Sequence, residues 1–113
     1  MKFVKQLILG VVILLLATFE GVADTDTALC QAIFKAEGGY EANQLFGINP
    51  KYVICNSYDE CEQVCLNTVK SKRKEYYQLK NRKDLSFLEY LAKRYCPENW
   101  EVWLKNVKWF LNN

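Results

Sequence analysis

Histidine is missing from the 113-residue sequence. Serine and cysteine hydrolases of the usual design need an imidazole base, and most catalytic zinc sites need imidazole ligands. The sequence therefore nearly excludes both classes. Any catalysis would have to depend on carboxylates, tyrosines, lysines or a thiol.

A hydrophobic run long enough to span a bilayer is also missing. The apolar run from Leu7 to Phe19 covers thirteen positions, whereas a membrane-spanning helix needs about 20 residues. Two lysines precede the run and small residues follow at positions 21–23, which is the pattern of a secretory signal peptide. We expect residues 1–23 to be a signal peptide and residues 24–113 to be one domain without a stable membrane anchor. An uncleaved anchor is the alternative.

The predicted mature chain has no large excess of either charge. Without Lys2, Lys5 and Glu20 it keeps 13 basic and 12 acidic residues, so nucleic acid is not an expected partner. The charge is uneven, because residues 70–83 hold seven basic residues and one acidic residue. This stretch is either a solvated helix end or a surface that attracts an anionic polymer such as cell wall.

Five cysteines follow the predicted signal peptide, where an oxidising compartment would let them staple a small domain. They are Cys30, Cys55, Cys61, Cys65 and Cys96. We favour a Cys65–Cys96 pair, since both lie on predicted helices. The odd thiol leaves open a covalent dimer or a buried monomeric thiol. No C-x-x-C spacing supports zinc, and we expect no metal or cofactor.

Hydrophobic periodicity predicts a mainly α domain with four helices and one irregular segment. The predicted helices are Thr27 to Ala36 with Thr27 as N-cap, Asp59 to about Tyr77, Leu85 to Tyr95 with Asp84 as N-cap, and a last helix after Asn99. Residues 40–58 are predicted to form a loop with a small hairpin.

Glu37 stands at the predicted end of the first helix, four residues after Ile33 and directly before Gly38 and Gly39. Two glycines supply the backbone freedom that ends a helix. A carboxyl group at the edge of a buried face is a candidate general acid, because burial disfavours its charged form. A surface glutamate at a helix end is the alternative interpretation.

The run Ile33-x-x-x-Glu37-Gly38-Gly39, with Ala42 and then Phe46-Gly47-Ile48, resembles the catalytic segment of lytic transglycosylases and other lysozyme-like muramidases. The likeness covers roughly residues 28 to 110 and includes Cys65-Leu66-Asn67-Thr68, Phe87-Leu88, Arg94-Tyr95-Cys96-Pro97 and Trp103-x-x-Asn106-Val107. It implies a lysozyme-like helical domain, stabilised by disulfides, in a secreted or periplasmic bacterial protein. The sequence departs from the pattern in having Gly38 for a frequent serine, and no Met-Gln or Ala-Tyr-Asn-Ala-Gly element.

The resemblance implies that Glu37 cleaves the MurNAc–GlcNAc bond of peptidoglycan glycan strands as a general acid and base. The implied substrate-binding residues are Gly47, Ile48, Tyr52, Asn67, Tyr95, Trp103 and Asn106. Tyr95 and Trp103 also fit a core role, because both lie on apolar stripes. A hydrolase usually needs a second carboxylate, for which Glu41 and Asp59 are candidates, whereas a lytic transglycosylase needs one. The alternatives are a non-catalytic lysozyme-like module that binds glycan or a protein, and a helical interaction protein such as a secreted inhibitor.

Overall fold

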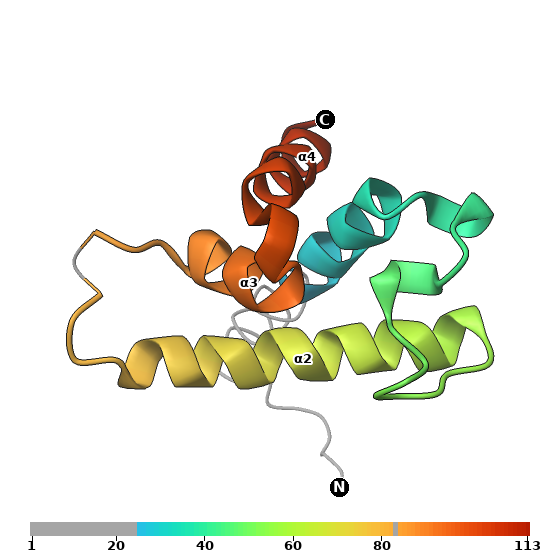
Figure 1. Cartoon of the computed structure of the whole chain (residues 1–113), viewed down its shortest axis with the longest axis horizontal. Helices are drawn as coiled ribbons and strands as arrows, with labels where there is room; N and C mark the ends of the chain where they lie inside the picture. Colours follow the sequence, from blue (N-terminus) through green and yellow to red (C-terminus); the bar gives the residue numbers. More distant parts are fainter. Residues whose placement is uncertain (1–24, 83) are drawn as a thin grey trace, which may run out of the picture.

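A computed structural model describes residues 25–82 and 84–113, and this part of the chain is mainly helical (Figure 1). Its α-helices are residues 25–36, α2 (Tyr58–Gln78), α3 (Phe87–Tyr95) and α4 (Trp100–Asn112), and its short 3-10 helices are η1 (Gly39–Glu41), η2 (Leu45–Gly47) and η3 (Pro97–Asn99). These ranges contain no strand. The predicted signal peptide, residues 1–23, lies outside the described residues. No helix in the described ranges is both long and apolar enough to traverse a bilayer.

The domain is built on α2, its longest helix. α3 packs against both α2 and α4, and η2 packs against α2. In Figure 1 the N-terminal helix, residues 25–36, lies on the same side of α2 as α3, while α4 leads away to the C-terminus. Each helix turns an apolar face toward one shared core. Its fully buried members are Cys30, Ile33, Phe46, Cys65, Val69, Leu91, Ala92 and Val107.

Serine side chains begin two of the helices. Ser57 Oγ accepts a hydrogen bond of 3.2 Å from the Glu60 amide, and Ser86 Oγ accepts one of 3.1 Å from the Glu89 amide. A hydroxyl at the N-cap satisfies an amide that has no partner within the helix. The prediction of Asp84 as N-cap is therefore wrong by two residues, and Thr27 is no cap because residue 25 is already helical.

The predicted hairpin in residues 40–58 is also wrong, because this segment consists of η1, η2 and turns. Aromatic rings hold it to the helices. The Phe46 ring lies 5.0 Å from the Phe34 ring and 5.5 Å from the Tyr58 ring, and Phe34 also meets Tyr40 edge-on at 4.9 Å. Side-chain packing on two helices thus replaces strand pairing as the source of order.

The disulfide joins Cys55 to Cys61 and attaches the end of the irregular segment to the start of α2. The predicted Cys65–Cys96 pair is wrong, since both thiols are free. Cys65 instead meets Cys30 of the N-terminal helix. The hydrogen bond between these two buried side chains, together with desolvation, raises the pKa of the Cys30 thiol far above its usual range.

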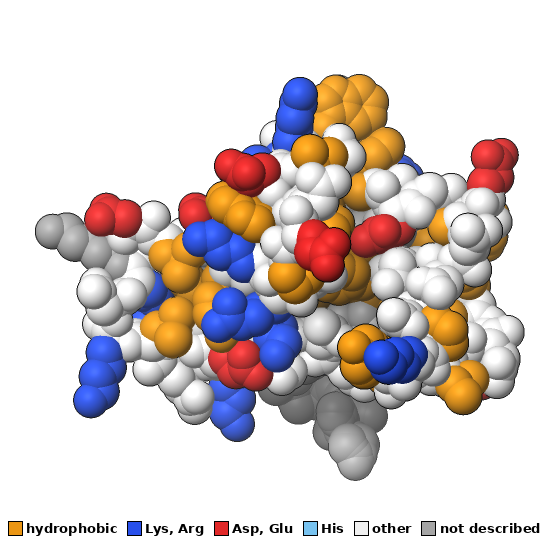
Figure 2. Space-filling model, viewed as in Figure 1, with side chains coloured by type: hydrophobic (Ala, Val, Ile, Leu, Met, Phe, Trp, Pro, Cys, Tyr) orange, Lys and Arg blue, Asp and Glu red, His pale blue; other side chains and the backbone are white. Residues whose placement is uncertain are grey.

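Charged side chains tie the helices together at the surface. Arg73 of α2 forms a 2.8 Å ion pair with buried Asp26 and lies over the Phe87 ring at 4.3 Å. Figure 2 shows Lys and Arg side chains gathered with apolar ones over α2 and α3. Arg94 lies 4.2 Å from the Tyr90 ring, and Arg82 lies 5.0 Å from the Tyr77 ring. Three arginines of this basic surface therefore lie against aromatic rings.

Candidate functional site

Glu37 follows directly after the N-terminal helix. Its amide donates the last helical hydrogen bond, 2.9 Å long, to the Ile33 carbonyl. Gly38 and Gly39 then take φ values of 112° and 63°, a region that costs L-residues energy but glycine very little. The chain therefore turns sharply after the acid, as the two glycines predicted. Glu37 itself is half-buried.

A second turn brings the backbone of Gly47 onto the carboxyl group of Glu37. A Cβ atom built on Gly47 would lie 2.5 Å from Cδ of Glu37, and 2.6 and 2.8 Å from its Oε2 and Oε1. Gly47 also has a φ of 69°. Glycine is required here for two reasons, since any side chain would strain the backbone and collide with the acid. The two turns of the sequence thus meet at one carboxyl group.

Phe46 holds this second turn in place. Its side chain is fully buried, and its φ of 60° makes it the one described non-glycine residue with a positive φ. A bulky residue in this region is an uncommon, strained conformation that the surrounding packing must maintain. The sequence analysis named Gly47 and missed the role of Phe46. The only sign of that role in the sequence is a large apolar residue directly before a glycine.

Trp103, on α4, reaches Glu37 from across the domain. Its indole Nε1 donates a 2.9 Å hydrogen bond to Oε2 of Glu37, and the residue is only 6% exposed. The indole ring stacks on the Tyr95 ring, with centroids 5.0 Å apart and planes 27° apart. Glu37, Gly47, Tyr95 and Trp103 therefore form one contiguous group, which we call the Glu37 cluster.

Tyr95 connects the Glu37 cluster to the turn at Phe46 and Gly47. Its hydroxyl donates a 2.6 Å hydrogen bond to the Phe46 carbonyl. Burial is the main cause that raises the pKa of Tyr95 well above its usual range, and contact with the Cys65 thiol adds to it. Tyr95 is therefore a neutral hydrogen-bond donor to the Phe46 carbonyl at all ordinary pH values.

The two oxygens of Glu37 have different surroundings. Oε2 accepts from Trp103, whereas Oε1 accepts no hydrogen bond from the described residues. In that part of the chain, Arg73 Nε is the one fully buried side-chain nitrogen or oxygen without a partner, so Oε1 is not fully buried. No ion pair among the described residues includes Glu37. The result is a carboxyl group with one oxygen held by a hydrogen bond and one oxygen that has no hydrogen-bond donor among the described residues.

The remaining predicted site residues are not members of the Glu37 cluster. Ile48, next to Gly47, is half-buried and lines a cavity of about 320 Å³ with Leu45, Pro50 and Ile54, but Glu37 does not line it. Tyr52 is 77% exposed on the irregular segment. Asn67 and Asn106 are exposed, so their amides need no buried partner; the Asn67 amide oxygen accepts from Gln63 at 3.0 Å.

Other features limit what the site can hold. Glu41 and Asp59, the candidate second carboxylates, are both exposed. Within the described ranges no group of three or more Cys, Asp or Glu side chains could hold a metal ion. Cys30 and Cys65 are buried beneath the cluster with the Cys30 thiol strongly biased to its protonated form, and such a thiol is a poor nucleophile.

Comparison with known proteins gave no family model, no curated protein and no solved structure that matches this chain.

Proposed function

We propose that this protein cleaves peptidoglycan glycan strands at the MurNAc–GlcNAc bond, with Glu37 as the single general acid and base. The observation that carries the proposal is the environment of the Glu37 carboxyl group. Trp103 donates a 2.9 Å hydrogen bond to Oε2, the Gly47 backbone packs against the group, and Oε1 has no hydrogen-bond donor among the described residues. A general acid must be both held in position and able to reach the bond it protonates.

The proposed reaction needs one carboxyl group. Protonated Glu37 gives its proton to the glycosidic oxygen as the bond breaks. The resulting carboxylate then takes a proton from the 6-hydroxyl of the muramoyl residue, which closes a 1,6-anhydro ring. Hydrolysis with water as nucleophile usually uses two carboxyl groups about 5 to 9.5 Å apart. The lytic route is favoured because Glu41 and Asp59 are exposed and no contact ties either of them to Glu37.

The wider setting of the proposal comes from the resemblance to the lysozyme-like superfamily. A lysozyme-like helical domain fits the mainly helical fold and the disulfide between Cys55 and Cys61. A secreted or periplasmic location in a bacterium would give such a protein access to its polymer, with residues 1–23 as the signal that directs it there. Glycan would lie along the irregular segment, where Ile48 lines a cavity and Tyr52 is exposed.

A second candidate is a non-catalytic module that binds glycan or another protein. It is favoured by the same hydrogen bond between Trp103 and Glu37, because a carboxylate that satisfies a buried indole has a structural role without any chemistry.

The test is to incubate purified peptidoglycan with the mature protein and with E37Q, and to analyse the soluble muropeptides by mass. We expect 1,6-anhydro products from the wild type and none from E37Q. E41Q is the matched control, because Glu41 is an exposed glutamate in the neighbouring turn and should keep full activity. Hydrated reducing ends would indicate a muramidase. No release by any variant, with protein still sedimenting with the glycan, would refute catalysis and favour the binding module.

A further inference from the structure

We propose that Trp103 is the positioning residue of Glu37, and that its hydrogen bond to Oε2 makes Oε1 the oxygen that carries the catalytic proton. This inference rests on the proposed function and adds a role for a residue on the last helix. Trp103 lies 66 positions from Glu37 in the sequence, so only the packing of α4 brings the two together.

Trp103 makes the two oxygens of the Glu37 carboxyl group unequal. The indole N–H is a donor and never an acceptor, so it always requires an acceptor oxygen opposite it. When Glu37 is protonated, the carbonyl oxygen is the better acceptor and the proton resides on the other oxygen. Since Trp103 Nε1 lies 2.9 Å from Oε2, the proton is assigned to Oε1, the oxygen that solvent and substrate can reach.

Trp103 is itself held by burial and by ring stacking. The residue is 6% exposed, and its ring stacks on Tyr95 with centroids 5.0 Å apart. Tyr95 in turn donates to the Phe46 carbonyl at 2.6 Å, directly before Gly47. One ring stack thus sets both the orientation of the carboxyl group and the position of the backbone beside it. A ring so buried has little surface left for stacking on a sugar, so we assign Trp103 to positioning.

Trp103 takes no part in the two proton transfers of the proposed reaction. The Oε1–H bond breaks as the proton moves to the glycosidic oxygen, and the bond between that oxygen and the muramoyl C1 breaks. The muramoyl 6-hydroxyl oxygen then bonds to C1, and its proton returns to Oε1. The indole keeps its own proton throughout, while the Oε2 contact prevents rotation of the carboxyl group between the two transfers.

The contact is tested without any substrate by the indole resonances of protein labelled with nitrogen-15. The variants W100F and W109F assign the other two tryptophan peaks and leave the third to Trp103. We expect the Trp103 proton to resonate downfield of the other two and to move upfield in E37Q, because a neutral amide is a weaker acceptor than a carboxylate. The peaks of Trp100 and Trp109 should stay in place. A Trp103 peak that does not respond to E37Q would overturn the proposal.

The positioning role is tested by the kinetics of W103F, with W109F as the matched control. Trp109 lies on the same helix and is 58% exposed, so its replacement should leave both constants unchanged. We expect W103F to lower kcat by about 10- to 100-fold, the scale of a misplaced catalytic group. KM should stay within about twofold, because a positioning residue does not touch the glycan.

The outcomes separate this inference from the proposed function. A folded W103F with normal kcat, or with KM raised and kcat kept, would overturn the positioning role while the proposed function stands. A wild type that releases no muropeptide would overturn both, whatever the indole resonances show. If W103F does not fold, the response of the Trp103 resonance to E37Q decides for or against the proposal.

Discussion

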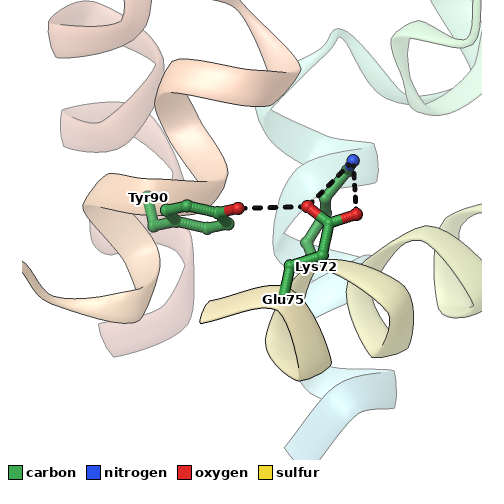
Figure 3. A network of polar contacts seen from close by, with 3 residues as sticks. All are labelled: Lys72, Glu75 and Tyr90. Atoms are coloured by element: carbon green, nitrogen blue, oxygen red, sulfur yellow. Dashed lines mark hydrogen bonds and ion pairs between the residues drawn. The ribbon is translucent and has the colours of Figure 1, made fainter. Parts of the chain in front are cut away.

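Two glutamates of this protein each accept a hydrogen bond from an aromatic side chain on a later helix, and their surroundings differ. Glu37 accepts from Trp103, while Glu75 on α2 accepts from the Tyr90 hydroxyl at 3.0 Å (Figure 3). Glu75 also forms a 3.2 Å ion pair with Lys72, one turn away on its own helix. Glu37 forms no ion pair with any of the described residues.

The difference separates a structural carboxylate from a candidate catalytic one. In Glu75 the Tyr90 hydrogen bond and then Lys72 hold the pKa below its usual range, so this group stays ionised at neutral pH. A general acid needs a proton to give, and a neighbouring cation disfavours the protonated form. A single neutral donor, such as the indole of Trp103, orients a carboxyl group without adding a positive charge. Among the described residues Glu37 forms no ion pair, whereas Glu75 forms one with Lys72.

The largest expected effect, on both stability and muropeptide release, is that of G47A, which changes the surroundings of Glu37. The new Cβ would lie 2.5 Å from Cδ of Glu37 and would occupy a residue with φ of 69°. Backbone strain of this kind costs about 1 to 3 kcal/mol, and the displaced carboxyl group should lower muropeptide release by about 100-fold. Chemical denaturation and the muropeptide assay measure the two effects.

G39A is the matched control for that variant. Gly39 has nearly the same φ, 63°, but its nearest new contact would be Cε2 of Phe34 at 3.8 Å. It should therefore show the backbone strain alone, with a loss of stability of about 1 kcal/mol and little loss of activity. Equal loss of activity in G39A and G47A would show that the contact between Gly47 and Glu37 has no special importance.

The next effect compares two tyrosines of α3, through Y95F and Y90F. Y95F leaves the buried carbonyl of Phe46 without its 2.6 Å partner, and such a loss costs about 1 to 3 kcal/mol. Y90F removes a donor to the partly exposed Glu75, which keeps Lys72 and water as partners. We expect Y95F to lower the free energy of unfolding much more than Y90F. Equal values in denaturant titrations would show that both hydroxyls are equally replaceable by water.

The smallest expected effect is the change in melting temperature caused by E75Q, and it depends on pH. Because the pKa of Glu75 is lowered on folding, its contribution to stability is present above the usual glutamate pKa of about 4.3 and is lost as pH falls through the lowered value. E75Q should melt slightly below the wild type at pH 6 and together with it at pH 2, with muropeptide release unchanged. A gap in Tm that is the same at both pH values would contradict the assigned pKa shift.

Helix positions were largely predictable, because each helix of the described chain has its own hydrophobic stripe. The prediction of Asp59 to Tyr77 differs from α2 by one residue at each end. The third helix was started too early because Asp84 and Ser86 are both good N-caps. Only the contact of Ser86 Oγ with the Glu89 amide distinguishes them. Local chemistry allows several caps, and packing selects one.

The pairing of the cysteines and the contacts within the site were harder to predict than the helices, because both depend on contacts between distant segments. Helical location alone suggested Cys65 and Cys96 as partners, but the face of α2 that carries Cys65 meets Cys30, and Cys55 folds back onto Cys61. In the site, the resemblance named both Glu37 and Gly47, with Gly47 as a substrate-binding residue, and the structure places the Gly47 backbone against the Glu37 carboxyl group. The partners of Trp103 and Tyr95 could not be read from apolar stripes, which predict burial and leave the polar contacts of a buried ring unspecified.

The sequence by itself determined the helices and the stop after Glu37, since spacing and backbone freedom are properties of neighbouring residues. It also limited any chemistry to groups other than imidazole. The need for glycine at position 47 was settled by the structure, where its backbone meets the Glu37 carboxyl group. Only the tertiary structure decided that Trp103 donates to Oε2 and that Oε1 has no donor among the described residues, because those facts depend on where α4 lies relative to the turn that carries Glu37. A helix can be bent, shifted or rotated by packing without any change in its own pattern, and the environment of a carboxyl group changes with it.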